Sequence, residues 1–301
     1  MSRRTSAVSR GRGRFVFACL APAFALYILF MVVPTIDVFR MSLFQWTGFS
    51  GTPSFIGFDN FVALATDQQF LRSLQNTVLL LVVVTIVTMA GALVIAALLM
   101  NPKIRARNVF RFILYLPSVL SIVVVAAIFS AVYDQQNGLL NNFLTFIGLG
   151  DLTQVWLGNE GLIMYSIAIA MLWQSIGYYV LLYMAGMSSI PADVYEAASL
   201  DGSGPIRTFF SITLPLVWST LRTTLTFFII SSINLAFVLV RALTGGGPNG
   251  SSDVLLNYMY SQAYTNSSYG YGMAIGVVIF VFSFVLALII NRATKREVYQ
   301  F

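Results

Sequence analysis

Six stretches of this chain are strongly apolar and contain no charged side chain, and no other feature constrains the fold as much. They span residues 15–36, 74–100, 112–133, 161–187, 223–240 and 271–291. A helix needs about 20 apolar residues to cross the ~30 Å hydrocarbon layer of a membrane. The sequence therefore predicts an all-α polytopic membrane protein with six transmembrane helices, whose membrane domain occupies residues 15–291.

The lysine and arginine residues lie outside these stretches and predict their direction across the membrane. Fourteen of the 17 lie on one predicted side, in residues 1–14, 103–111, 207–222 and 292–296. Only Arg40, Arg72 and Arg241 lie on the other side. Because cytoplasmic segments carry the excess of basic residues, we expect cytoplasmic tails at both termini, residues 1–14 and 292–301. The basic residues form no face interleaved with aromatic residues, so nucleic acid is not expected as a partner.

The composition excludes several kinds of chemistry. The chain has no histidine and a single cysteine, Cys19, so it offers neither a Cys/His metal cluster nor a histidine base. Its lysines, Lys103 and Lys295, do not follow the glycines of a phosphate-binding loop. We therefore expect a chain that is not an enzyme and binds no metal or cofactor. If ATP drives its function, a partner must bind the ATP.

Two functions that need no ATP-hydrolysing partner can be considered for such a membrane protein. An ion-coupled secondary transporter of a small polar solute usually keeps ionisable side chains at membrane depth, and the six apolar stretches have none. Backbone carbonyls can also bind Na⁺, however, so ion coupling remains the main alternative. A membrane enzyme has less support, because no cluster of nucleophile, base and metal ligands lies at the ends of the stretches.

The segment between the fourth and fifth stretches, residues 188–216, is longer than a simple connection requires. Pro191 suits the first turn of a helix and Gly202 suits its left-handed cap, so a short helix is predicted from Pro191 to Asp201. Gly204-Pro205 should restart the chain in a second short helix, which Pro215 should end.

This segment is predicted to project into the cytoplasm and to dock in a groove of a partner protein. Ala197, Ala198 and Leu200 would be buried against the partner, and Glu196 would make a charged contact. A solvated connection with ordinary helix caps is the simpler interpretation of Pro191 and Gly202 taken singly.

The residues of this segment resemble the signature loop of binding-protein-dependent ATP-binding-cassette (ABC) importer permeases. The matching residues are Glu196-Ala197-Ala198, Asp201-Gly202, Ile212 and Leu214-Pro215. Elsewhere the chain resembles the carbohydrate (maltose-type) branch, in particular the first of its two permease subunits. Those matches are Phe110-Arg111, Leu116-Pro117, Gly138-Leu139-Leu140-Asn141 and Leu243-Thr244-Gly245-Gly246-Gly247-Pro248. The resemblance extends from about Phe15 to Arg292, and it departs mildly at Ser203, where alanine is commoner.

The resemblance implies a type I ABC importer permease in the bacterial cytoplasmic membrane, carrying a sugar or an oligosaccharide. It implies that Glu196, Ala197, Ala198, Asp201 and Gly202 form a coupling helix seated in an ATPase subunit, and that Leu214 and Pro215 set the exit angle of the loop. The implied partners are a second homologous permease subunit, two ATPase subunits that bind ATP and Mg²⁺, and an extracytoplasmic solute-binding protein.

Uncharged polar side chains within the fourth and fifth stretches are candidates for the substrate pathway, because sugar hydroxyls need hydrogen-bond partners and sugar C–H faces stack on aromatic rings. These candidates are Gln174, Ser175, Tyr178, Ser231 and Asn234. The alternative is that such groups join helices by hydrogen bonds, which is the better interpretation for Ser231 and the adjacent Ser232. Gln75 and Asn76, at the start of the second stretch, are predicted to be helix caps.

Overall fold

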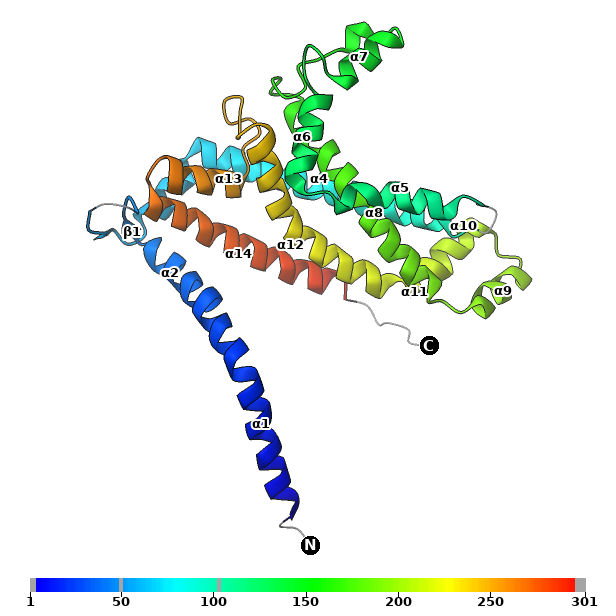
Figure 1. Cartoon of the computed structure of the whole chain (residues 1–301), viewed down its shortest axis with the longest axis horizontal. Coiled ribbons are helices and arrows are strands. Elements are labelled where there is room, and N and C mark those ends of the chain that lie inside the picture. The colour runs from blue at the N-terminus through cyan, green and yellow to red at the C-terminus, as the bar shows by residue number, and fades with distance from the viewer. Residues whose placement is uncertain (1–3, 49–50, 102–103, 296–301) are drawn as a thin grey trace. The chain divides into compact units, whose positions relative to one another are not determined.

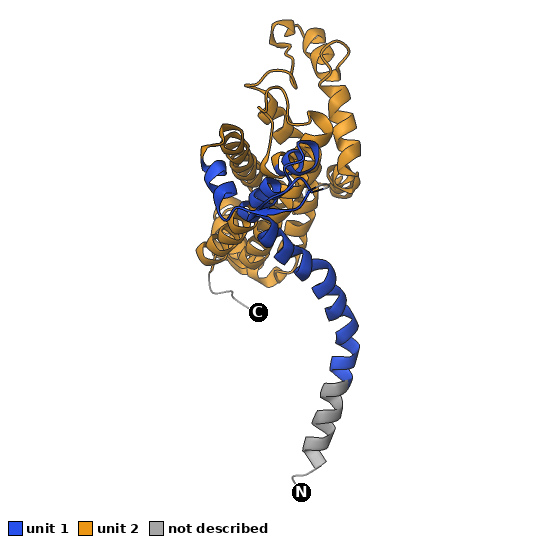
Figure 2. Ribbon diagram, turned by 90° about the vertical axis from the view of Figure 1, so that its left-hand side faces the viewer, with its two compact units in different colours: residues 1–65, 259–278 blue, residues 66–258, 279–301 orange. Residues whose placement is uncertain are grey.

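The computed structural model describes residues 4–48, 51–101 and 104–295, with side chains from Phe15 onward (Figure 1). Three of the basic residues that predict the topology, Arg3, Lys103 and Arg296, lie outside the described residues. Residues 297–301 of the C-terminal tail also lie outside them. The described chain is mainly helical. It divides into two compact units, residues 1–65 with 259–278 and residues 66–258 with 279–301 (Figure 2).

The smaller unit contains the first predicted span. Helix α1 (Arg4–Tyr27), a π-helical turn (Ile28–Val32) and α2 (Val33–Met41) follow one another without interruption, and residues Phe15–Met41 are long and apolar enough to cross a membrane. The short strands β1 (Phe44–Gln45) and β2 (Ser54–Phe55) then pair antiparallel. The Asn60 side chain, in α3 (Asp59–Thr66), fastens this hairpin by donating to the carbonyls of Ser42 at 2.8 Å and Phe44 at 3.1 Å.

The larger unit is a helical bundle built on three long helices, α4 (Gln68–Leu99), α8 (Ile163–Ser188) and α12 (Trp218–Leu243). Helix α8 packs against α4 and α5 (Arg107–Val119), and α12 packs against α4, α8 and α6 (Ile122–Val132). A Cβ atom at Gly177 would overlap the Leu114 carbonyl, so this glycine lets α5 and α8 approach closely.

Shorter elements connect these helices, and two helices cross between the units. The connecting elements are α7 (Leu139–Phe146), a 3₁₀ turn (Gly150–Leu152), α9 (Ala192–Leu200), α10 (Pro205–Thr208), a π-helical turn (Phe209–Thr213) and α11 (Leu214–Leu216). The crossing segments are α13 (Leu255–Tyr260), followed by a π-helical turn (Ser261–Thr265), and α14 (Tyr269–Ala293).

The third apolar stretch, predicted as one span over residues 112–133, is instead a bent pair of helices. The chain bends by 101° between α5 and α6, across a break of two residues. Leu120 and Ser121 adopt extended backbone, with ψ values of 142° and 139°. Pro117 contributes to the break, because its missing N–H removes a hydrogen bond from the last turn of α5.

The prediction of an all-α polytopic membrane fold is confirmed. Among the described residues, five helices are long and apolar enough to cross a membrane, and the bent pair α5–α6 makes a sixth if it is one span. The helices also continue past the apolar stretches. Helix α4 begins at Gln68, where the Asp67 side chain accepts hydrogen bonds from the first-turn N–H groups of Gln69 and Phe70.

Candidate functional site

Helix α9 confirms the short helix predicted from Pro191 to Asp201 and shows how its end is formed. Gly202 has a φ of +73°, the left-handed conformation that favours glycine. The Gly202 N–H donates to the Ser199 carbonyl at 3.0 Å, and the Ser203 N–H donates to the Ala198 carbonyl at 2.9 Å. This pair of bonds is the Schellman motif, so the turn after α9 is determined by its own local sequence.

The residues expected to contact a partner do not all face outward. Glu196, Ala197 and Asp201 are exposed, and Leu200 is 90% exposed. Ala198, in contrast, is only 5% exposed because it packs within this chain. The expectation that Ala198 is buried against a partner is therefore wrong. Exposed residues toward the end of α9 and at its C-cap include Glu196, Ala197, Leu200 and Asp201, and we call these four the α9 outer face.

The return from α9 to α12 is more helical than the sequence predicted. The second short helix ends within one residue of Pro215, because the helical turns Pro205–Thr208, Phe209–Thr213 and Leu214–Leu216 stop at Leu216, before α12 begins at Trp218. A proline ring normally clashes with the carbonyl four residues earlier, and the wider π-helical turn at Phe209–Thr213 relieves that clash. The Tyr195 and Thr213 hydroxyls lie 3.3 Å apart and join α9 to this return segment.

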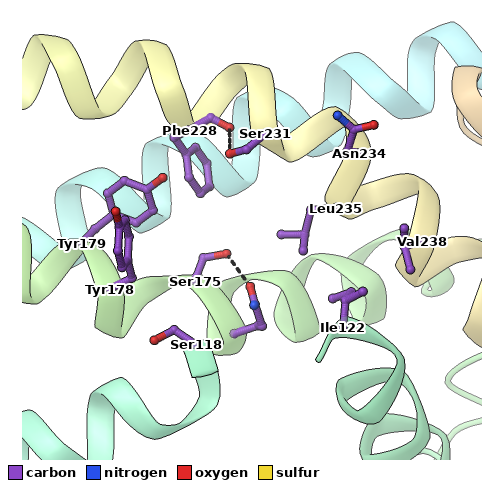
Figure 3. Close-up of a pocket in the computed structure, with 11 residues that line it drawn as sticks. Ser118, Ile122, Ser175, Tyr178, Tyr179, Phe228, Ser231, Asn234, Leu235 and Val238 are labelled. Carbon is purple, nitrogen blue, oxygen red and sulfur yellow. Dashed lines mark hydrogen bonds between the residues drawn. The ribbon is translucent and has the colours of Figure 1, made fainter. Parts of the chain in front are cut away.

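All five candidate substrate-pathway residues line one cavity of about 420 Å³ in the larger unit (Figure 3). Gln174, Ser175 and Tyr178 come from α8, whereas Ser231 and Asn234 come from α12. The cavity also contains residues that the sequence did not single out, namely Ser118, Ile122, Tyr179, Phe228, Leu235 and Val238. Ser118 and Ile122 stand on either side of the α5–α6 bend, so the bend helps to form the cavity wall.

The cavity offers uncharged hydrogen-bonding groups beside aromatic rings. Ser175 Oγ donates to Gln174 Oε1 at 3.3 Å, and Ser231 Oγ donates to the Phe228 carbonyl at 3.0 Å (Figure 3). Asn234 is exposed to the cavity and forms no side-chain hydrogen bond with the part of the chain that the structure describes. The Tyr178 and Tyr179 rings meet edge to face at 5.2 Å. Among the residues whose side chains the structure describes, no charged one lines this cavity.

Ser232 behaves differently from Ser231, its neighbour in α12. It is buried and donates to the Phe228 carbonyl at 2.7 Å, and it does not line the cavity. The interpretation of Ser232 as a structural residue is consistent with this position. Ser231 lines the cavity although its hydroxyl also bonds to its own helix.

The loop that follows α12, residues 244–254, is held by side chains far away in the sequence. Asn76 Nδ2 donates to the carbonyls of Ser251 and Asp253, each at 2.9 Å, so the prediction that Asn76 caps a helix is wrong. Gln69 Nε2 donates to the Gly250 carbonyl at 3.2 Å. The Leu255 N–H, just beyond the loop, donates to Thr77 Oγ1 at 2.9 Å. No local pattern in the sequence could have identified these partners.

Two carboxylates, one within this loop and one bonded to it, occupy opposite environments. Asp253 is 7% exposed, and its burial raises the pKa of its carboxyl, although Asn257 Nδ2 donates to Asp253 Oδ1 at 2.7 Å. Glu160 is exposed, and hydrogen bonds from Asn249 and Arg72 lower the pKa of its carboxyl. The Arg72 Nη2 and Glu160 Oε2 atoms are 3.0 Å apart.

No group of three or more His, Cys, Asp or Glu side chains is arranged to hold a metal ion in the part of the chain that the structure describes. A helical membrane bundle with an uncharged polar cavity between its spans, and with a projecting capped helix, defines the class of membrane permeases.

The chain belongs to the family described as binding-protein-dependent transport system inner membrane components, which matches residues 89–297. It is 37% identical to the probable ABC transporter permease protein YurN of Bacillus subtilis, over 89% of this chain and 92% of that relative. It is 33% identical to the diacetylchitobiose uptake system permease protein NgcF of Streptomyces coelicolor, over 94% of this chain and 84% of that relative.

Among solved structures, the chain resembles the bacterial alginate ABC transporter in complex with its alginate pentasaccharide-bound periplasmic protein. The TM-score is 0.83 at 25% identity, over 96% of this chain and 98% of that chain. The chain is thus a permease subunit of an ABC transporter and not an enzyme, and the family has no cofactor of its own. Both the predicted family and the predicted permease role are confirmed, which favours them over the ion-coupled alternative.

Proposed function

We propose that this permease forms half of the translocation pathway of an ATP-driven importer for a neutral sugar or oligosaccharide. The cavity between α8 and α12 is the observation that carries this proposal, because its lining is uncharged, hydrogen-bonding and partly aromatic. Hydroxyl and amide groups can replace the water that a sugar loses on binding, and aromatic rings can cover its C–H faces.

The names of the relatives support a saccharide as the transported solute, and the lining of the cavity indicates which class of saccharide fits. One relative is named for diacetylchitobiose, and the similar solved transporter was crystallised with a protein that holds an alginate pentasaccharide. Alginate is an acidic polysaccharide. The cavity here has no cationic side chain to neutralise a carboxylate. A neutral saccharide therefore fits its chemistry better than an acidic one.

The same proposal assigns the partners and the orientation. A second permease subunit would complete the pathway, two ATPase subunits would bind ATP and Mg²⁺, and a solute-binding protein would deliver the sugar from outside. The membrane domain, residues 15–291, would lie in the bacterial cytoplasmic membrane, and the tails 1–14 and 292–301 would lie in the cytoplasm. The excess of basic residues on that side supports this orientation.

Coupling to the ATPase would occur at the α9 outer face. Glu196, Ala197 and Leu200 are exposed on a helix whose end is fixed by its own backbone hydrogen bonds. An exposed projection can transmit movement of a partner to α12, to which it is joined through the helical turns that contain Leu214 and Pro215. Closure of the ATPase subunits on ATP would then alternate access to the cavity.

Uptake by the purified complex in vesicles tests this proposal. Uptake should require ATP and the solute-binding protein, and the binding protein should select a neutral saccharide when it is screened against sugars. Asn234→Leu should reduce uptake because it removes an amide that faces the cavity, whereas Ser232→Ala should leave the apparent affinity for the sugar unchanged. Uptake driven by an ion gradient without ATP would contradict the proposal.

A further inference from the structure

A smaller polar cavity, about 270 Å³ in volume, lies between the beginning of α12 and the end of α14. It combines one arginine with hydroxyl and amide groups and a single phenyl ring. Its lining residues are Ser219, Arg222, Thr223, Thr226, Phe227 and Asn291. All six belong to the larger unit, and none of them lines the proposed sugar cavity. The translocation pathway therefore does not account for this cavity.

Arg222 gives the cavity a positive charge that no carboxylate of the described chain neutralises. Its Nη2 atom donates to the Asn291 carbonyl at 3.2 Å and to Asn291 Oδ1 at 3.1 Å. Within residues 15–48, 51–101 and 104–295, Arg222 forms no ion pair. Because a guanidinium has five N–H donors, several remain for a ligand. The exposed Ser219 hydroxyl offers one more donor. Such a set suits an anion with several acceptor oxygens, as a phosphate has.

The cavity lies where apolar helix surface changes to polar helix ends. Phe227, in its wall, is exposed, and on α14 the exposed Phe284 and Leu288 precede Asn291 on the same helix face. Trp218 Nε1 donates to the Thr294 carbonyl at 2.9 Å, and the exposed Arg292 precedes Thr294 by two positions in the chain. Tryptophan and basic residues are typical of the membrane interface, where lipid phosphates lie.

We propose that this cavity binds the phosphate of an anionic phospholipid, with Arg222 as the anion-binding residue and Ser219 as a supporting donor. The exposed Phe227 would lie along the first carbons of an acyl chain. Basic pockets between membrane helices bind anionic headgroups in this way. The site goes beyond the proposed function, because it concerns the lipid around the permease and not the solute that it carries.

The test uses the delipidated, full-length permease within its purified complex. Native mass spectrometry would count bound dioctanoyl phosphatidylglycerol during a titration, with dioctanoyl phosphatidylcholine and inorganic phosphate as comparison ligands. Arg222→Gln removes the charge at the cavity. Arg111→Gln is the matched control, because Arg111 is another half-exposed arginine near the end of an apolar stretch but lies outside the cavity. Ser219→Leu narrows the cavity without changing its charge and serves if Arg222→Gln does not fold.

We expect Arg222→Gln to weaken phosphatidylglycerol binding about fivefold or more, as loss of one basic side chain near a membrane surface implies. Arg111→Gln should leave the affinity of the site unchanged, and Ser219→Leu should also weaken binding. Competition by inorganic phosphate that depends on Arg222 would identify free phosphate as a second source of the same ligand. Equal phosphatidylglycerol binding by the wild type, Arg222→Gln and Ser219→Leu would overturn the proposal. So would loss of the ATPase subunits from Arg222→Gln with unchanged lipid binding, because the cavity would then be a protein contact.

Discussion

Helix α12 follows one loop, residues 189–217, and precedes another, residues 244–254, and the two loops hold their conformations by different means. The loop before α12 is formed largely by local backbone bonds and leaves the α9 outer face exposed. The loop after α12 also contains local backbone bonds, but in addition it is held by side chains of α4 that lie 175 to 181 positions away in the sequence. The first loop can therefore keep its shape while part of its surface stays exposed, whereas the second loop depends on side chains of the bundle.

The largest effect on stability should come from removing the anchor of the second loop. Asn76→Ala would leave the Ser251 and Asp253 carbonyls without their side-chain donor. Two buried acceptors without partners should destabilise the fold by roughly 2–4 kcal/mol. The measurement is the apparent melting temperature of the purified protein in detergent. Gln75→Ala is the control, because Gln75 is exposed on the same helix. Equal melting temperatures for the two variants would contradict the claim that the loop after α12 depends on the Asn76 side chain.

A smaller effect is expected from the cap of α9. Gly202→Ala places a Cβ in open space, so only the strain of a φ of +73° opposes it. That strain should amount to about 1–2 kcal/mol and should be confined to the end of α9. Hydrogen exchange of the α9 amides would show local loss of protection, together with weaker retention of the ATPase subunits. Gly204→Ala is the control, because Gly204 has an ordinary φ of −72° and open space around it. Loss of protection throughout the bundle would contradict a locally determined loop.

The dependence of stability on pH should distinguish the two carboxylates beside the second loop. Burial raises the pKa of Asp253 in the folded state, so its contribution to stability is fully present below the unfolded-state pKa of about 3.9 and is lost as the pH rises through the folded-state pKa. Glu160 has a lowered pKa, so its contribution is present above the unfolded-state pKa and is lost as the pH falls.

Asp253→Asn should therefore raise the melting temperature relative to the wild type at neutral pH, and this gain should shrink on acidification toward pH ~4. Glu160→Gln should change the melting temperature in the opposite direction and lower it slightly at neutral pH. Melting curves of both variants between about pH 4 and 8 provide the measurement. If both variants changed the melting temperature in the same direction, the burial of Asp253 would not distinguish its carboxyl from that of Glu160.

The smallest effect on stability, within about 0.5 kcal/mol, should come from Glu196→Gln, because this side chain is exposed. Its effect on function should be large, since a charged contact with the ATPase would be lost, and ATP-driven uptake should fall about tenfold or more. Asp193→Asn is the matched control, because Asp193 is an exposed carboxylate in the first turn of the same helix. Normal uptake and normal ATPase retention by Glu196→Gln would remove the coupling role.

The sequence by itself determined five of the candidate membrane spans and the short helix after α8. Both are local properties, since a span is a run of apolar residues and the end of α9 depends on hydrogen bonds between residues five or fewer positions apart. It also identified five polar residues in two stretches, which the structure places around one cavity.

Only the tertiary structure decided which of these groups face one another. The bend between α5 and α6 brings Ser118 and Ile122 to the cavity. Packing of the loop before α12 buries Ala198, and Asn76 donates its hydrogen bonds to the loop after α12. These outcomes depend on contacts between residues far apart in the chain. Hydrophobic periodicity and capping patterns describe only neighbours along the sequence, and for that physical reason they could not reveal them.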